Sequence, residues 1–308
     1  MDPQLLCSHF DALGNAVLLE QLKQIKTRTY DYRYPELKAR TLIPVSNEIN
    51  PGASVMEWRS YDSVGAVKLL SAYAKDLPRS DIRAEVNLTP IRSLGGAYGY
   101  NIDEMAAAVF RGEPLDAKKA AAVRKSYEVE IDRLAALKDA KSNLLGLLNQ
   151  PNAITHTIPN GAAGTATWAT KTGPEIIEDM LGILSTIKTT TKSVERADTI
   201  LIPSDQYGLI QTTMYEDDSD FTVLEFFRRI SPGIEVIEWD RCNGAGTGGA
   251  DRMVAYRRSP EYLELQIPKE LTALPPQEIV LEVVVNHHAR FGGVTVYVPY
   301  SMAYGDGV

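Results

Sequence analysis

Hydrophobic residues recur at three- and four-residue steps between Pro114 and Leu148, a spacing that predicts one long amphipathic helix. The apolar stripe consists of Val123, Tyr127, Ile131, Leu134 and Leu137. Asp116 is a suitable N-cap, because its carboxylate can accept hydrogen bonds from the free amides of the first turn. A helix from Asp116 to about Ser142 would be roughly 40 Å long, so we expect other parts of the chain to lie along it.

The charged residues of this segment are expected on the opposite, solvated face of the helix. Glu128 and Asp132 are spaced to pair there with Arg124, Lys125 and Lys138. Exposed pairs of this kind are common on helix surfaces and contribute little to stability. They therefore give no indication of a catalytic site.

The segment before this helix begins with a weak amphipathic pattern at residues 11–26. Residues 27–52 follow, and their three prolines argue against regular structure. Their tyrosines and aliphatic residues are nevertheless too apolar for a free linker. We therefore expect residues 1–51 to form an arm that lies along a surface, of this chain or of a neighbouring copy.

Two extended runs, Ser54–Asp62 and Arg83–Tyr100, have the composition of strands. Alternation at period two is clearest at Ile82, Ala84, Val86 and Leu88. We expect residues 52–100 to form one long β-hairpin with a substantial tip. Because two strands cannot bury their own faces, such a hairpin needs a partner surface, either in its own domain or in a neighbouring chain.

The remaining pattern predicts three further parts. Residues 101–172 contain a short helix (DEMAAAVFRG), the long helix and a turn-rich connector, and residues 173–270 alternate helices with short strands. In this α/β unit, helices are expected after Thr172, after a cap at Ser204 and after a cap at Asp220. Residues 271–308 read as two strands bent at Gly292 and Gly293, which we expect to return to a sheet beside the long helix.

The composition is ordinary for a globular chain of 308 residues, with 44% hydrophobic and 23% charged residues. A formal net charge of −8 without a Lys/Arg block makes the chain a poor candidate for gripping nucleic acid, although an acidic surface can line a compartment that holds it. Cys7 and Cys242 are far apart, which excludes a disulfide framework and indicates a reducing compartment. Neither a signal peptide nor a membrane span is recognisable, so we expect a cytoplasmic location without membrane contact.

The sequence from Gly244 to Gly249, GAGTGG, follows a predicted strand and matches the glycine pattern of dinucleotide-binding loops. That chemistry requires a helix after the glycines, because the pyrophosphate lies at the helix N-terminus. The sequence that follows reads as a strand, so we interpret the glycines as a flexible hairpin tip. A cytosolic α/β enzyme that binds a nucleotide here is the alternative from a different functional class.

No catalytic, cofactor-binding or metal-binding residues are predicted. His287 and His288 are adjacent on a predicted strand and point to opposite faces. The acidic run from Glu216 to Asp220 lacks the central glycine and terminal glutamate of a calcium-binding EF-hand loop. The chain also lacks HExxH, phosphate-loop and nucleophile-elbow motifs.

The order of these parts resembles that of the major capsid proteins of tailed double-stranded DNA phages, whose HK97-like fold is shared with encapsulin compartments. Several segments are similar to one phage capsid family in particular, formerly filed as a domain of unknown function. They are YPELKARTLIPVSNEINPG (34–52), YDSVGAVKLLSAYAKDLPRSD (61–81), GLLNQPN (146–152), TILIPSDQYG (199–208) and HARFGGVTVYVPYSMAYGDG (288–307). The likeness covers nearly the whole chain.

The resemblance implies an α+β, HK97-like capsid fold in five parts. These are an N-terminal arm (1–51), an extended β-hairpin loop over a neighbouring subunit (52–100), a peripheral domain with a spine helix (101–172), an axial domain (173–270) and C-terminal strands returning to the peripheral domain (271–308). Contacts between subunits are expected at Trp58, Tyr61, Lys68, Tyr73, Lys75 and Arg79 of the hairpin and at Gly244, Gly246 and Gly248 of an axial loop. Flexible hinges are expected at Gly95, Gly96, Gly99 and the same axial loop.

The function implied is structural: a major capsid protein, not an enzyme, that self-assembles as pentamers and hexamers into an icosahedral shell around phage DNA. The DNA would be enclosed without sequence-specific binding, and the virion shell would assemble in the cytoplasm of a bacterial host. Scaffolding, portal and decoration functions would come from separate proteins. Lys68 and Lys75 lack matching cross-linking partners, so no covalent linkage is predicted. An encapsulin-like compartment is the alternative within the same fold.

Overall fold

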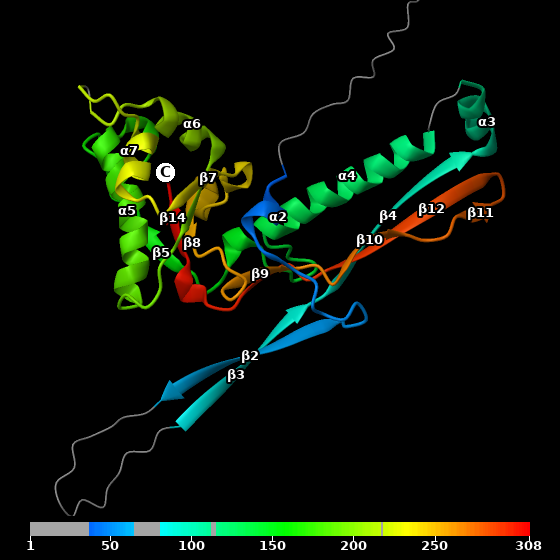
Figure 1. Ribbon diagram of the computed structural model, residues 1–308, viewed down its shortest axis with the longest axis horizontal. Helices are drawn as coiled ribbons and strands as arrows, with labels where there is room; N and C mark the ends of the chain where they lie inside the picture. The colour runs from blue at the N-terminus through cyan, green and yellow to red at the C-terminus, as the bar shows by residue number, and fades with distance from the viewer. Residues whose placement is uncertain (1–36, 65–80, 112–114, 217) are drawn as a thin grey trace, which may run out of the picture. The chain divides into compact units, whose positions relative to one another are not determined.

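The computed structural model describes residues 37–64, 81–111, 115–216 and 218–308 (Figure 1). Three expectations lie wholly or largely outside these residues. They concern the weak helix at 11–26, the N-terminal arm as far as residue 36, and the hairpin-tip residues Lys68, Tyr73, Lys75 and Arg79.

The alternating pattern after residue 52 forms a hairpin, but a shorter one than expected. Strand β2 (Val55–Val64) pairs antiparallel with β3 (Asp81–Pro90) along its whole length. The second predicted run is not one strand. β3 ends at Pro90, opposite Val55, the first residue of β2, and one further bond follows, from the N–H of Ile91 to the carbonyl of Ser54 at 2.9 Å. Its continuation, β4 (Arg92–Asn101), pairs instead with β12 (Glu282–Phe291). The expectation of a single hairpin over 52–100 is therefore wrong beyond Pro90.

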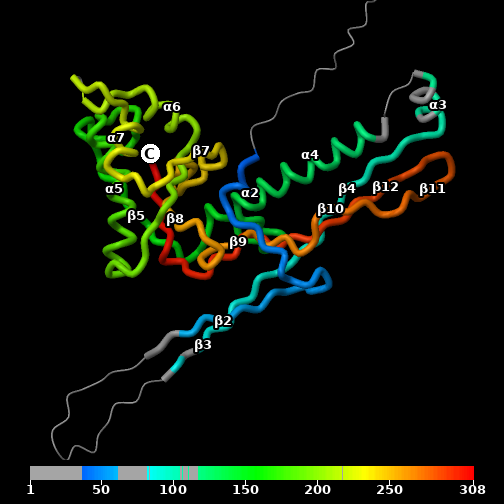
Figure 2. Tube along the Cα trace, in the orientation of Figure 1, coloured from blue at the N-terminus to red at the C-terminus, as the bar shows by residue number. Residues whose placement is uncertain are grey.

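Strand β12 is the centre of the sheet that lies beside the long helix. β4 pairs with one edge of β12, and β10 (Lys269–Ala273) and β11 (Gln277–Ile279) pair antiparallel with the other. Figure 2 shows β4, β10 and β12 running together next to the helix α4. Of the C-terminal strands that were expected to return to this region, only those before the glycine bend, β11 and β12, lie in this sheet, whereas residues 294–296 and 303–306 pair with strands outside it.

The predicted long helix is α4 (Leu115–Ala136), preceded by α3 (Ile102–Arg111). Tyr127, Ile131 and Leu134 of the predicted stripe are buried. Asp116 lies inside the helix and not before it, so the predicted N-cap is wrong. The helix also ends earlier than Ser142.

The early end of α4 has a local cause. Asp139 and Leu144 form an isolated antiparallel bridge that turns the chain back, and Gly146 then lies against the carbonyl of Ala136. A Cβ at Gly146 would collide with that carbonyl and with the N–H of Leu137. The chain therefore leaves the helix because the next segment packs directly across its last turn.

A second sheet contains five strands in the order β5-β14-β8-β6-β7. The strands are β5 (Ile154–Thr157), β6 (Thr199–Ile202), β7 (Glu235–Glu238), β8 (Arg252–Tyr256) and β14 (Ala303–Asp306). Three helices accompany them: α5 (Gly173–Thr190), α6 (Ser204–Thr212) and α7 (Val223–Ile230). β5 and β14 lie outside the range 173–270 expected for this unit, so the sheet draws on both flanking segments as well.

This five-stranded sheet separates two hydrophobic cores, because successive side chains on a strand point to opposite faces. On β8, Val254 and Tyr256 contribute to the core that contains α4, whereas Met253 and Ala255 contribute to the core beneath α5. A three-stranded sheet, β1-β9-β13, completes the first core with the short helix α2 (Ala39–Leu42). Its strands are β1 (Val45–Ser46), β9 (Leu263–Gln266) and β13 (Val294–Val296).

Short 3-10 turns occupy several connections: η1 (Leu147–Asn149), η2 (Trp168–Thr170), η3 (Asp240–Cys242), η4 (Thr247–Gly249) and η5 (Pro299–Ser301). The predicted bend at Gly292 and Gly293 is confirmed, since it separates β12 from β13. Gly293 adopts a φ of 75°, a conformation that glycine adopts without steric cost.

The predicted helix caps are partly right. α5 starts after Thr172, whose backbone N–H donates to the carboxylate of Glu175 at 2.8 Å. Ser204 is the first residue of α6 and not its cap. Asp220 does not cap α7 either: Thr222 does, with its hydroxyl accepting from the N–H of Glu225. The S/T-x-x-E spacing of both pairs is the capping-box signature.

Candidate intersubunit surfaces

The β2–β3 hairpin presents one exposed apolar face. Antiparallel pairing places odd-numbered residues of β2 opposite even-numbered residues of β3 on the same side. Five large hydrophobic side chains on this side are 48–68% exposed: Val55, Tyr61, Ile82, Val86 and Leu88. Within the described residues Tyr61, Val86 and Leu88 thus remain more than half exposed, so this face of the hairpin offers apolar area to a partner surface.

The other face of the hairpin contacts its own chain. The ring of Trp58 meets the ring of Tyr297 edge to face, with centroids 5.2 Å apart and an interplanar angle of 87°. The hydroxyl of Tyr297 donates to the carboxylate of Glu264 at 2.7 Å and accepts from the amide of Gln266 at 3.1 Å. Trp58 was expected to contact a neighbouring subunit. The structure places it against Tyr297, a contact that no local sequence pattern indicates.

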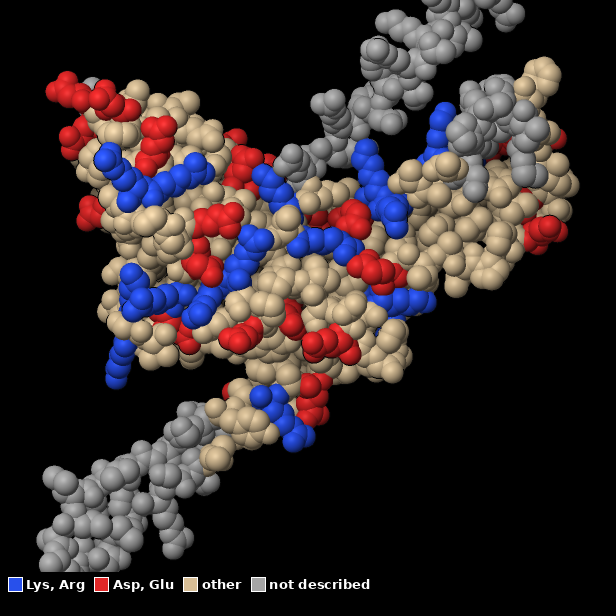
Figure 3. Space-filling model, viewed as in Figure 1, with Lys and Arg blue, Asp and Glu red and all other residues tan. Residues whose placement is uncertain are grey.

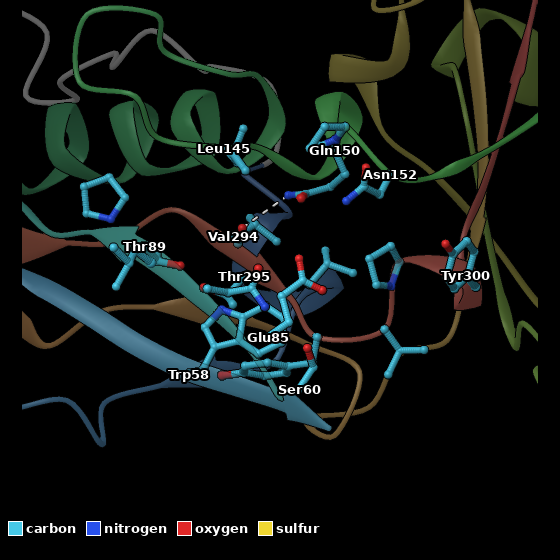
Figure 4. A pocket seen from close by; sticks show the side chains of 18 of the residues that line it. Trp58, Ser60, Glu85, Thr89, Leu145, Gln150, Asn152, Val294, Thr295 and Tyr300 are labelled. Carbon is cyan, nitrogen blue, oxygen red and sulfur yellow. Dashed lines mark hydrogen bonds between the residues drawn. The ribbon is translucent and has the colours of Figure 1, made fainter. Parts of the chain in front are cut away.

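A cavity of about 410 Å³ lies between this face of the hairpin and the body of the protein (Figure 4). Figure 4 shows Trp58, Ser60 and Glu85 on the hairpin side, opposite Leu145 and Gln150. The side-chain amide of Gln150, on the side of the cavity opposite the hairpin, donates to the carbonyl of Val294 in β13 at 3.2 Å. The cavity is a gap beneath the hairpin, lined by ordinary polar and apolar side chains.

Gly244, Gly246 and Gly248 lie together in the loop between β7 and β8. These two strands do not pair with each other, because β6 lies between them in the sheet. The expectation of a hairpin tip is therefore wrong. Gly244 and Gly248 adopt φ values of 64° and 72°, so both use a conformation that other residues rarely adopt.

The same loop is anchored and not free. Asp306 accepts hydrogen bonds from the backbone N–H and the hydroxyl of Thr247, at 3.0 and 2.9 Å, and pairs with the guanidinium of Arg252 at 2.6 Å. Burial alone would raise the pKa of Asp306, but the bonds from Arg252 and Thr247 outweigh it and lower the pKa. The loop is thus held by a charged carboxylate from the C-terminal strand.

This anchoring also argues against the alternative that the loop from Gly244 to Gly249 binds a nucleotide. The loop is followed by strand β8 and not by a helix, as the sequence indicated. The amide of Thr247 already donates to Asp306, whose negative charge would oppose a phosphate. The dinucleotide-binding mechanism therefore lacks both its helix and its free amides here.

Gly95, Gly96 and Gly99, which were expected to act as hinges, lie inside β4 and pair with β12. A Cβ at Gly96 would come within 3.1 Å of the side chain of Val123 on α4. One at Gly99 would collide with the carboxylate of Glu282. At these two positions glycine allows close approach of neighbouring groups within a paired strand.

The charged face of α4 is used within the chain. Asp132 is buried and accepts from the backbone N–H of Ala39 at 3.2 Å and from Nε of Arg241 at 2.8 Å. Glu128 accepts from Arg40, whose guanidinium also contacts Glu270 at 2.7 Å. The expectation that both carboxylates lie on the solvated face is therefore wrong for Asp132, which bonds to α2 and η3. Arg124, Lys125 and Lys138 are exposed, as expected for a solvated face.

Among the described residues, no group of three or more His, Cys, Asp or Glu side chains is arranged to hold a metal ion. A search of the same residues finds no helix with the length and hydrophobicity needed to cross a membrane. Cys242 is buried, and burial raises the pKa of its thiol.

Solved structures similar to this chain include phage and particle capsids. The chain matches the capsid of the Myoviridae phage XM1 with a TM-score of 0.82 and 17% identity, covering 94% of this chain and 98% of that one. It matches the capsid of a native GTA particle with a TM-score of 0.66 and 11% identity, covering 92% and 94%. For Mycobacterium phage Bobi the TM-score is 0.61 at 14% identity, covering 93% and 96%. At these identities the likeness establishes the HK97-like fold.

The chain matched none of the curated protein sequences with which it was compared. The family model described as "Major capsid protein" matches residues 65–308, which is most of the chain. The predicted α+β capsid fold is thereby confirmed, and the encapsulin-like and nucleotide-binding alternatives are not favoured. This chain belongs to the major capsid protein family and is a structural protein of a phage virion shell, built from capsid oligomers.

Proposed function

We propose that this chain assembles as pentamers and hexamers into a closed icosahedral shell that encloses the double-stranded DNA of a tailed phage. The proposal rests chiefly on the exposed apolar face of the β2–β3 hairpin. A two-stranded hairpin is marginal in water, and contiguous exposed apolar area of this kind marks a protein contact. In a capsid the surface that adjoins each subunit belongs to neighbouring subunits, so a neighbouring subunit is the proposed partner.

The hairpin provides the kind of contact that such a shell needs. Tyr61, Val86 and Leu88 can be buried on a neighbour without any change in the rest of the chain, because they contact little of their own body. Each hairpin would bind a subunit that other subunits of the shell already contact. Weak individual contacts then add up to a stable assembly, because each further contact is effectively intramolecular. The tip residues Lys68, Tyr73, Lys75 and Arg79 and the axial residues Gly244, Gly246 and Gly248 are further proposed contacts.

The proposed domain division follows the sheets. The peripheral domain would contain α3, α4, β4 and β10–β12, and the axial domain would contain the five-stranded sheet with α5–α7. β5 and β14 then belong to the axial domain, although their residues flank it in sequence. Asp132 and Arg241 would join the two domains.

Enclosure of DNA without sequence-specific binding is consistent with the charge of the chain. A net charge of −8 disfavours tight binding to phosphates, since such binding needs clustered cations. The proposed role is therefore that of a container and not of an enzyme. Scaffolding, portal and decoration functions would come from other proteins, and assembly would take place in the bacterial cytoplasm.

Electron microscopy of the protein expressed in bacteria tests this proposal. We expect closed shells of uniform diameter made of five- and six-membered rings. Particles formed with the phage's DNA-packaging proteins should protect DNA from nuclease. Shells that never contain five-membered rings, or a compact species of one or two copies under all assembly conditions, would contradict the proposal.

A further inference from the structure

The helix α5 carries mixed apolar and charged patches of opposite sign at its two ends. At its N-terminal end, Gly173 lies against the backbone of Met214 and Tyr215, so the loop that follows Met214 is located there. In this loop Glu216, Asp218 and Asp220 are exposed. Met214 and Phe221 flank them and are 51% and 40% exposed. We call these five residues the acidic patch.

At the C-terminal end of α5, the chain turns through residues 191–196. Lys188, Lys192 and Arg196 are exposed there, and Val194 between them is 75% exposed. We call these four residues the basic patch. Glu195 lies in the same turn and is half-buried, with its Oε2 atom buried, so three exposed cations surround one partly buried carboxylate there.

The two patches cannot meet within one chain. α5 has 18 residues, which separates its ends by about 27 Å. Figure 3 shows acidic side chains gathered at the end of this unit where the loop between α6 and α7 lies. In the described part of the chain, none of the six charged side chains of the two patches forms an ion pair.

Other charged groups lie near the patches. Arg229 of α7 stacks over Phe221 at 5.0 Å, and Arg228 donates to the hydroxyl of Tyr207 at 3.4 Å, so both keep their positive charge and offset part of the acidic patch. Glu178 adds a further exposed carboxylate to the N-terminal half of α5. Of the residues near the basic patch, Arg258 pairs with Glu235 at 3.1 Å and so adds no net charge.

We propose that the acidic patch of one subunit docks on the basic patch of a second copy of this chain. The charges are complementary, and each patch offers exposed apolar side chains that contact would remove from water. Because the two patches are different surfaces of one chain, the contact is head to tail and closes into a ring when the rotation between copies permits. The inference rests on the proposed function, for which it names one contact within a ring of subunits.

Charge reversal tests this inference: the yield of shells from each charge-reversed variant is compared with the yield from the unmodified protein. One variant replaces the acidic charges by lysine (Glu216→Lys, Asp218→Lys, Asp220→Lys), and another replaces the basic ones by glutamate (Lys188→Glu, Lys192→Glu, Arg196→Glu). We expect each variant alone to lower the yield of shells by about tenfold or more. A tenfold change corresponds to about 1.4 kcal/mol of contact free energy. The chain that combines both sets should recover most of the yield, since the two patches are then complementary again.

A matched control separates docking from a general effect of charge. Lys118→Glu, Lys138→Glu and Lys141→Glu change the net charge as much as the basic-patch variant does, at exposed positions away from α5. This control should assemble like the unmodified chain. Equal loss in the control, or no recovery in the combined variant, would overturn the inference.

A second variant guards against misfolding as the explanation. Lys192 adopts a φ of 53°, which is favourable for glycine, so Lys192→Gly should leave the melting temperature unchanged or raise it. Shell yield should nevertheless fall, and less salt should be needed to disrupt the rings, because one of the three basic charges is lost. If the unmodified chain forms no shells, the proposed function fails. If it forms shells that all patch variants also form, only this inference fails.

Discussion

Nε of Arg241 donates to the buried carboxylate of Asp132 at 2.8 Å, which joins the turn after β7 to the spine helix α4. The other oxygen of Asp132 accepts from the backbone N–H of Ala39 at 3.2 Å. One carboxylate therefore fixes three segments that lie far apart in the sequence.

The substitution Asp132→Asn removes the charge that Arg241 requires at a site with little access to water. We expect it to lower the free energy of unfolding by about 1–3 kcal/mol, the usual cost of leaving a buried polar group unsatisfied. Urea denaturation of the subunit measures this loss.

The matched control is Glu130→Gln on the same helix. Glu130 pairs with Arg133 at 2.6 Å, but both side chains are about 40% exposed. Exposed pairs of this kind contribute about 0–1 kcal/mol. A loss as large as that of Asp132→Asn would contradict the special role of the buried carboxylate.

On α4 the apolar stripe can be predicted from the sequence, but the environment of Asp132 cannot. The apolar stripe was predicted correctly because helical periodicity is a local property of Tyr127, Ile131 and Leu134. The partners of Asp132 lie 93 and 109 residues away. No local spacing reveals them, so helical periodicity alone places the carboxylate on the solvated face.

Two glycine substitutions should have opposite effects on stability. Gly146→Ala places a methyl group against the carbonyl of Ala136, which neither backbone segment can avoid without a shift. Gly208 lies inside α6 with open space around its Cα, so Gly208→Ala lowers only the entropy of the unfolded chain. We expect Gly146→Ala to lower the free energy of unfolding by about 1–3 kcal/mol. Gly208→Ala should raise it by about 0.5–1 kcal/mol.

Thermal unfolding of both variants measures these effects. Stabilisation by Gly146→Ala would mean that the segment after α4 does not pack across the last turn of the helix.

The contact between Asp306 and the glycine loop predicts a dependence on pH. Burial opposes ionisation of Asp306, but the bonds from Arg252 and Thr247 prevail, so its pKa is lowered from 3.8. Stabilisation by this carboxylate is therefore complete above its unfolded pKa and is lost as the pH falls through the lower folded value.

Asp306→Asn should destabilise the subunit at neutral pH, and the difference from the unmodified chain should shrink as the pH falls below 3.8. Unfolding free energies measured for both chains between pH 7 and about pH 2 provide the comparison. A difference that stays constant over this range would show that the ionised carboxylate does not anchor the loop.

Substitutions on the exposed face of the hairpin should impair assembly without impairing folding of the subunit. Replacing Tyr61, Val86 and Leu88 by serine changes exposed side chains, so the melting temperature of the subunit should change by little. Assembly should be lost, because these side chains form the proposed contact with a neighbour. Leu274→Ser, at a residue 42% exposed outside the hairpin, is the control and should assemble normally. Normal shells from the triple variant would refute the hairpin contact.

The hairpin shows a second limit of the sequence. Alternation at period two identified β3 as a strand and grouped Ile82, Val86 and Leu88 on one of its faces, since that pattern is local. The end of the hairpin at Pro90 and the transfer of β4 to β12 depend on pairing with residues about 190 positions later. The glycine loop is not the predicted hairpin tip for a related reason, because β6 lies between β7 and β8, which are neighbours along the chain.

The particle mass of the purified protein, measured by light scattering at increasing concentration, tests the central claim most directly. The account predicts particles of megadalton mass built from subunits of 33.9 kDa, and no such particles from the hairpin triple variant. A compact dimer that binds nucleotide at every concentration would contradict the account.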